Sequence, residues 1–431
     1  MGYFGLFVLL TFYAILLVFC RATSKKVLLT PEFVFILGFI PQLTLALLYV
    51  NKWELILSLD TFLVYFFGGL YFVMISLIIR QCFFSKKINV SNQNYNQKIQ
   101  IKRWKLIVTI IFHIMAIVIM AKALINRMNA GNLLAAIELY TKIGKGQGLE
   151  FPSLPGKLNL FSYLSGFVWG YYLIHAFTYK YKTHYILLSV NLILSFISNM
   201  LTGSRGGVLQ VILTMVFLAY ILYEEKNGWR FNIRIKTLIR IIILGILLLI
   251  VFQKSLSWIG RSTETKSFID YIALYVSAEV KNIDIRIREG YMAFRPMSNW
   301  STLNRSLSKI YSLFGMDIKR YADSSTYITF KGIDLGNVYT IFYSFIRDLN
   351  YLGIFVFETI MAFISQLSLS KIFKQKSIRP SLHMAKMIYS YILTMLFYSF
   401  FSNWFFDNVI STGFVWCLIT WFLFKLFLEK E

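Results

Sequence analysis

Cysteine and histidine are scarce in this sequence. The 431 residues include three cysteines and four histidines, and no CxxC, HExxH or GxxxxGK[ST] pattern occurs. Those patterns mark thiol redox sites, zinc proteases and phosphate-binding loops. The histidines show no spacing that would ligate a metal. We therefore expect neither a metal centre nor a cofactor.

Acidic residues are also scarce, with 20 Asp and Glu against 44 Lys and Arg, which gives a formal net charge of +24. Such an excess of positive charge is one mark of proteins that bind nucleic acid. Here the basic residues lie largely between apolar runs, as the signals that orient membrane helices do. The sequence therefore favours a membrane protein and predicts no nucleic-acid partner.

Long apolar runs are abundant. Hydrophobic residues make up 57% of the chain and recur in stretches long enough to cross a bilayer. A soluble globular protein could not shield so many long apolar segments, so we predict an all-α, polytopic membrane protein with about eleven transmembrane helices. The predicted spans are 2–20, 29–50, 55–79, 105–122, 157–178, 185–201, 207–223, 237–253, 349–370, 382–401 and 409–427.

Basic loops predict the orientation of these spans. Residues 80–105, 224–240 and 371–380 are rich in Lys and Arg and share one side when the spans alternate. The positive-inside rule makes that side the cytoplasm. The opposite side then holds the loops 123–156, 202–206, 254–348 and 402–408.

The predicted topology divides the chain into three parts. Residues 1–253 carry the first helices, 254–348 form one large extracytoplasmic loop, and 349–431 carry the last helices. The cysteines at positions 20, 82 and 417 all lie outside the extracytoplasmic loops, which excludes a disulfide framework there. No repeated half is evident, whereas many transporters carry internal repeats.

The long extracytoplasmic loop contains a group of arginines. The stretch AEVKNIDIRIREGYMAFRPMSNWSTLNRSL holds Arg286, Arg288, Arg295 and Arg305 among aromatic residues, with a single lysine. One interpretation is an amphipathic helix lying on the membrane. The other is an anion site, because guanidinium suits bidentate phosphate contacts and aromatic faces suit sugar rings.

A second candidate lies in the turn SNMLTGSRGGVLQ, between two apolar runs. The helix after this turn begins on the extracytoplasmic side, so its N-terminus points at Arg205. A cation there is opposed by the helix dipole unless an anion lies between them. Gly206 and Gly207 would let phosphate approach the free backbone N–H groups. The alternative is a tight turn in which Arg205 reaches lipid phosphate.

Two motifs resemble one protein family. LTGSRGGVLQ, and GNVYTIFYSFIRDLNYLGIF at 336–355, are similar to motifs of the bacterial oligosaccharide repeat-unit polymerases, the Wzy-type O-antigen and capsule polymerases. The number of spans and the one large loop before the last helices agree with that family. The resemblance implies a GT-C-like glycosyltransferase in the bacterial cytoplasmic (inner) membrane. Its substrates would be oligosaccharides linked to undecaprenyl pyrophosphate, with membrane lipid around it. A chain-length regulator and a repeat-unit flippase would be its partners in lipopolysaccharide or capsule biosynthesis.

The implied reaction displaces lipid pyrophosphate from an anomeric carbon. It needs cations for the developing negative charge and, in one version, a base for the acceptor hydroxyl. We predict catalytic roles for Arg205, Arg288 and Glu289, with Asp323 and Asp348 as alternative bases. Predicted substrate-binding residues are Gly203, Ser204, Gly206, Arg286, Arg295, Asn337, Tyr339, Arg347 and Asp348.

The second motif also predicts where the next span begins. A helix starting at Asn337 would place Arg347 and Asp348 near the middle of the bilayer, which is costly. Starting the span at Leu349 leaves both at the interface, either as the edge of a site or as an anchor for the helix end. The loop 123–156, with glycines at 144, 146 and 148, is a candidate lid.

Two other functions are alternatives to a polymerase: a ligase, and a flippase or transporter. An O-antigen ligase would share the topology, but the related ligases carry a histidine in the corresponding late region and this chain has none on the extracytoplasmic side. A non-enzymatic flippase or transporter of lipid-linked glycans should carry cationic residues inside a membrane cavity. Here the cations gather in an extracytoplasmic loop.

Overall fold

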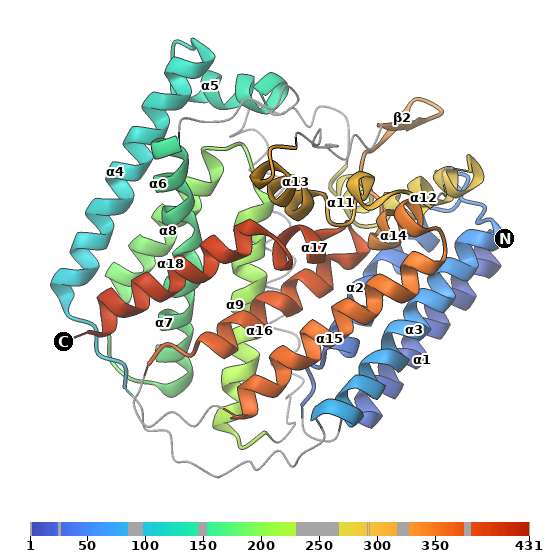
Figure 1. Ribbon diagram of the computed structural model, residues 1–431, viewed down its shortest axis with the longest axis horizontal. Coiled ribbons are helices and arrows are strands. Elements are labelled where there is room, and N and C mark those ends of the chain that lie inside the picture. The colour runs from blue at the N-terminus through green and yellow to red at the C-terminus, as the bar shows by residue number, and fades with distance from the viewer. Residues whose placement is uncertain are drawn as a thin grey trace. The chain divides into compact units, whose positions relative to one another are not determined.

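A computed structural model shows a predominantly helical chain (Figure 1). It describes residues 2–24, 27–84, 98–144, 153–229, 267–290, 292, 294–316, 327–374 and 381–430. The predicted span 237–253 and the candidate base Asp323 lie outside these residues. The chain forms two compact units, each built from separate stretches of sequence.

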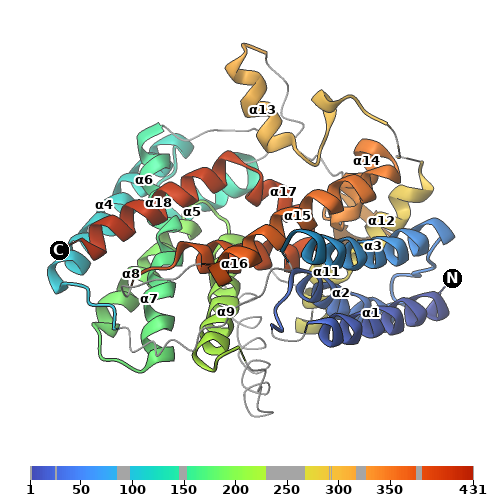
Figure 2. The same cartoon turned by 60° about the horizontal axis from the view of Figure 1, so that its bottom comes forward.

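The first unit comprises Met1–Val90, Ile269–Gln375 and Tyr391–Val415. Its long apolar helices lie side by side, with α1 against α2 and α3, and α3 against α15 (Figures 1 and 2). The described residues of the 254–348 segment add α11, α12, a short 3-10 helix, α13 and a short antiparallel hairpin to this unit before α14. The elements are α1 (Tyr3–Thr23), α2 (Pro31–Leu48), α3 (Leu59–Phe84), α11 (Phe268–Val276), α12 (Ala278–Arg288), α13 (Asn304–Leu313), β1 (Ile328–Phe330), β2 (Ile333–Gly336), α14 (Ile341–Leu349), α15 (Leu352–Lys374) and α17 (Trp404–Val409).

The second unit comprises Ser91–Phe268, Lys376–Ser390 and Trp416–Glu431. In it α4 packs on α6 and α8, and α7 packs on α8 and α9. Its elements are α4 (Arg103–Met128), α5 (Leu133–Leu139), a π-helical turn (Tyr140–Gly144), α6 (Ser153–Leu164), α7 (Gly166–Tyr179), α8 (Tyr185–Met200) and α9 (Gly206–Lys226). The boundary between the units passes through α16 (Met384–Phe397) and α18 (Thr412–Glu429).

Seven helices among the described residues are long and apolar enough to cross a membrane. This confirms a helical, membrane-spanning protein, while the count of eleven spans and the GT-C-like architecture stay predictions. Some predicted spans differ locally: 157–178 is split into α6 and α7 at Ser165, and α8 has only 16 residues. The seven helices are Tyr3–Thr23, Pro31–Leu48, Leu59–Cys82, Arg103–Met128, Gly206–Lys226, Leu352–Phe373 and Thr412–Glu429.

The predicted break before the late span is present. The helix that carries Arg347 and Asp348 ends at Leu349, and α15 begins at Leu352 as a separate helix. Asn350 lies between them with φ 50° and ψ −156°, a backbone conformation outside the helical region, so α14 cannot continue through it. A Cβ at Gly353 would lie 2.1 Å from the Phe345 carbonyl oxygen. The glycine therefore allows the first turn of α15 to fold back onto α14.

Aromatic packing fixes α14 within the first unit. Phe342 stacks on Phe39 of α2 with ring centroids 5.3 Å apart. A Cβ at Gly68 of α3 would lie 2.6 Å from the Phe342 ring, so the absence of a side chain there makes room for that ring. A fully buried aromatic side chain contributes about 1.5–3 kcal/mol relative to an exposed one. This contact holds the second motif in place.

Candidate functional site

Helix α12 carries two of the four predicted arginines, Arg286 and Arg288, and presents two polar faces. At 3.6 residues per turn, Lys281, Asp284 and Arg288 fall on one face, whereas Asn282, Arg286 and Glu289 fall on another. The helix packs against α2, α3 and β2. Arg286 and Arg288 therefore point in different directions, although only one residue separates them.

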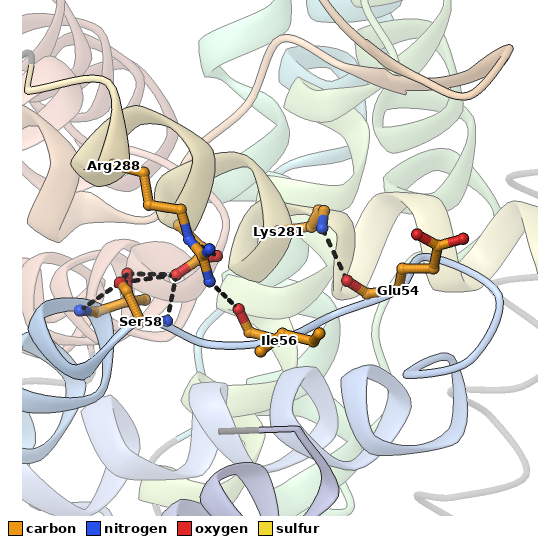
Figure 3. A network of polar contacts seen from close by, with 7 residues as sticks. Glu54, Ile56, Ser58, Lys281 and Arg288 are labelled. Atoms are coloured by element: carbon orange, nitrogen blue, oxygen red, sulfur yellow. Dashed lines mark hydrogen bonds and ion pairs between the residues drawn. The ribbon is translucent and has the colours of Figure 1, made fainter.

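The first face is bound to the connection between α2 and α3 (Figure 3). The Asp284 Oδ1 atom accepts hydrogen bonds from the backbone N–H of Ser58 at 2.8 Å and from the hydroxyls of Ser58 and Thr61 at 2.9 and 2.8 Å. Lys281 Nζ donates to the Glu54 carbonyl at 2.9 Å. The carboxylate of Asp284 is buried, so these bonds join α12 to the loop strongly.

Arg288, the predicted catalytic arginine, belongs to this connection. Its Nε donates to Asp284 Oδ2 at 2.9 Å, and a terminal nitrogen donates to the Ile56 carbonyl (Figure 3). The side chain is still 49% exposed. The geometry thus gives Arg288 a structural task, and its catalytic role stays a prediction.

Arg286 lies on the second face and contacts two other predicted site residues. Its terminal nitrogen is 2.8 Å from a Glu289 carboxylate oxygen, and its Nε donates to the Tyr339 hydroxyl at 3.2 Å. The side chain of Arg286 is 12% exposed, while that of Glu289 is 44% exposed. The structure therefore brings together a partly enclosed guanidinium, an accessible carboxylate and a phenol.

Aromatic rings extend this group along α14. Tyr339 and Tyr343 stack with centroids 4.4 Å apart and an interplanar angle of 26°. Arg347 follows Tyr343 by four residues and so lies on the same side of α14, one turn further along. Asn337 is exposed just before this row. We define Arg286, Glu289, Tyr339, Tyr343 and Arg347 as the α12–α14 polar row.

Asp348 lies on another side of α14 and has partners for both carboxylate oxygens. It accepts bonds from the Ser301 backbone and hydroxyl at 2.8 and 3.0 Å and from the Thr302 backbone at 2.7 Å. Its carbonyl accepts from the Arg295 N–H at 2.8 Å. Burial raises the pKa of Asp348, although the bonds from Ser301 and Thr302 oppose this. Asp348 therefore holds the 295–302 segment, and a role as base or ligand stays a prediction.

We expect Asp348→Ala to lower the free energy of unfolding by roughly 2–4 kcal/mol, because it leaves buried N–H and hydroxyl donors without an acceptor. Thermal unfolding of the detergent-solubilised protein measures this. The exposed Asp334 of β2, whose carboxylate accepts from the nearby Gly336 N–H at 3.0 Å, provides the matched control Asp334→Ala. Equal melting temperatures for the two variants would contradict the assignment.

The turn around Arg205 lies in the second unit. Arg205 is the residue immediately before α9, and only 8% of its surface is exposed. Gly203 has φ 61°, and a Cβ there would lie 2.0 Å from the Thr141 hydroxyl. A Cβ at Gly207 would lie 2.4 Å from the Asn199 amide nitrogen. Gly203 and Gly207 are thus explained by close packing, while Ser204 and Gly206 are half-buried beside Arg205.

The residues that orient α12 were not among the site residues predicted from the sequence. Asn282 is fully buried and donates through its amide nitrogen to the carbonyls of Leu335 and Val338, at 3.2 and 2.9 Å. Asp284 joins the same helix to the α2–α3 connection. The sequence did hold a signal for this arrangement. Asn282 is four residues from Arg286, and Asp284 is four residues from Arg288, so helical spacing places the two arginines on different faces of α12.

Comparisons of this chain with protein-family models, with curated proteins and with solved structures give no match. Among the described residues, no three His, Cys, Asp or Glu side chains gather as metal ligands would. The two motifs and the α12–α14 polar row are therefore the features of this chain that bear on its function.

Proposed function

We propose that this protein is a polymerase that joins oligosaccharide repeat units carried on undecaprenyl pyrophosphate into O-antigen or capsular polysaccharide. The reaction would take place at the extracytoplasmic face of a bacterial cytoplasmic membrane. The observation that carries the proposal is the enclosed Arg286 guanidinium, held by Glu289 and Tyr339 beside the Tyr339–Tyr343 stack. The family resemblance of the GSRGG and NVYT motifs, and the apolar helices, support it.

The α12–α14 polar row suits this substrate for two reasons. A guanidinium removed from bulk water interacts more strongly with phosphate oxygens than an exposed one does, and its planar fork binds two oxygens together. Tyr339 and Tyr343, 5% and 9% exposed, form a rigid aromatic wall beside the guanidinium, of which only a small area is open to a sugar ring. Arg347, on the same side of α14, supplies a second cation along the row.

In the proposed reaction, an acceptor hydroxyl of one lipid-linked unit attacks the anomeric carbon of the growing chain. The new bond joins the acceptor oxygen to that carbon, while the bond from the carbon to the pyrophosphate oxygen breaks. Arg286 stabilises the negative charge that develops on the departing pyrophosphate. Glu289 takes the acceptor proton, because it is accessible and adjacent to Arg286, whereas Asp348 is enclosed by donors.

Arg205 is a second candidate for phosphate binding, in the other unit. It precedes the first turn of α9, where backbone N–H groups lack helical acceptors. An anion at this position would be attracted both by the helix N-terminus and by the guanidinium. We propose this role for Arg205 separately from the α12–α14 polar row.

The decisive experiment deletes the gene and examines glycan length by gel electrophoresis. We expect the deletion strain to make only single repeat units attached to the carrier or core, and the wild-type gene to restore long chains. Loss of the single-unit form as well would indicate a ligase or a flippase and would reject the proposal. Purified protein that elongates lipid-linked repeat units in detergent would establish the activity directly.

A further inference from the structure

Helix α12 also carries a buried acid that the proposed function does not use. Glu279 is 0% exposed, and neither of its carboxylate oxygens makes a hydrogen bond of ordinary geometry with a described residue. Burial raises the pKa of Glu279 well above its usual range, and the nearby Gln42 amide opposes this only in part. An ionised carboxylate in such a place is strongly unfavourable unless a positive charge balances it.

Two further buried oxygens near Glu279 accept no hydrogen bond of ordinary geometry from a described residue. Asn282 lies one turn along the same helix. Its amide nitrogen donates to the Leu335 and Val338 carbonyls, which fixes the orientation of the amide. Its Oδ1 atom then makes no hydrogen bond with a described residue. The Thr340 hydroxyl, two residues after Val338, is 1% exposed and also makes no ordinary hydrogen bond. Polar oxygens of Glu279, Asn282 and Thr340 that make no hydrogen bond of ordinary geometry with a described residue therefore occur in one small region of the first unit.

Two more oxygens face the same region from α2 and α3. The Tyr65 hydroxyl lies close to both Glu279 and Thr340, and it donates a hydrogen bond to Gln42 Oε1 at 3.4 Å, which leaves its own oxygen free to bind a cation. Gln42 is oriented by its amide nitrogen, which donates to the Phe400 carbonyl at 2.8 Å. Its oxygen is thereby turned toward Tyr65. The charged neighbours on α12 are engaged elsewhere, since Lys281 and Arg288 bind the α2–α3 connection.

We propose that this region is a binding site for a monovalent metal cation of the sodium class, with ligands from the oxygens of Gln42, Tyr65, Glu279, Asn282 and Thr340. Hard cations take carboxylate, amide and hydroxyl oxygens as ligands. A single positive charge neutralises the single carboxylate, whereas a divalent ion would leave a buried excess charge. The bound cation would join α12 to α2, α3 and the start of α14.

A proton could neutralise the Glu279 carboxylate in place of a cation. The stability of the protein depends on pH differently in the two cases. Without a cation, folding raises the pKa of Glu279, so stability falls as the pH rises above the usual range of a glutamate, where the unfolded chain loses its proton first. A cation replaces the proton, so stabilisation by sodium grows as the pH rises.

The test is thermal unfolding of the purified protein at constant ionic strength, with NaCl replaced by choline chloride, at several pH values. We expect saturating NaCl to raise the melting temperature by about 5 °C at pH 8, with a smaller rise at pH 6. A melting temperature that responds to pH but not to NaCl would overturn the cation site in favour of a protonated acid. A melting temperature insensitive to both would overturn it as well.

Three variants distinguish stabilisation by sodium bound at this site from general effects of salt on the protein. Glu279→Gln, which keeps the shape and removes the charge, should fold and lose the NaCl effect, and Thr340→Val should require more NaCl for the same rise. Asp334→Asn, at an exposed carboxylate of the same unit, should respond as the wild type does. An undiminished NaCl effect in Glu279→Gln would overturn the proposal.

Discussion

Arg286→Ala is expected to reduce glycan polymerisation by roughly 100–1000-fold, which corresponds to about 2.7–4 kcal/mol of transition-state stabilisation. The reason is that the guanidinium is only 12% exposed and is held beside Tyr339 and Glu289. A preorganised cation of this kind stabilises charge without rearranging during the reaction. The measurement is chain length in the complemented deletion strain, at matched protein abundance.

Lysine substitutions distinguish phosphate binding from simple attraction to anionic lipid. Arg286→Lys should recover part of the activity, because an ammonium lacks the planar fork that binds two oxygens. Full activity of Arg286→Lys would favour attraction to lipid instead. The matched control is Arg305→Ala, since Arg305 lies in the same segment with a 61% exposed side chain. It should leave chain length unchanged.

Arg288 provides a second comparison, because the sequence singled it out beside Glu289. Its bonds to Asp284 and the Ile56 carbonyl predict that Arg288→Ala lowers the melting temperature more than the activity per folded molecule. The reverse result, normal stability with no activity, would restore Arg288 as the catalytic arginine.

The broad class of fold was predictable because hydropathy reports it directly. Helices such as α1, α4 and α15 appear close to the predicted spans. The separation of α14 from α15 also followed from the cost of burying Arg347 and Asp348 in a bilayer. The break at Ser165 was not predicted, because both halves of that run are apolar and composition alone does not mark the interruption.

Which of the predicted site residues lie together in space was less predictable from the sequence. Nearness in sequence placed Arg286, Arg288 and Arg295 together, but a helix turns successive side chains to different neighbours. Arg286 meets Tyr339, a residue 53 positions away, whereas Arg288 binds Asp284 and the Ile56 carbonyl. The enclosure of Asp348 by Ser301 and Thr302 likewise depends on tertiary contacts that no local pattern shows.

Arg205→Ala is expected to reduce polymerisation by a similar factor, roughly 100–1000-fold, while leaving the protein folded. Arg205 directly precedes α9, where the backbone N–H groups of the first helical turn lack helical acceptors. Only 8% of its surface is exposed, so the side chain is largely enclosed by protein. A phosphate bound at this position would be attracted both by these N–H groups and by the guanidinium.

Two companion variants decide between binding and support of the turn. Gly203→Ala should lower stability, because the residue has φ 61° and faces Thr141 at close range. If Arg205 merely anchors the turn, Arg205→Ala should show the same loss of melting temperature. If Arg205 binds phosphate, the Arg205→Ala and Arg127→Ala variants should have the same melting temperature, since Arg127 is an exposed arginine of the same unit. Glycan chains should then become short in Arg205→Ala and keep their length in Arg127→Ala. Wild-type glycan length in Arg205→Ala would remove this residue from the proposed mechanism and leave Arg286 as its main cation.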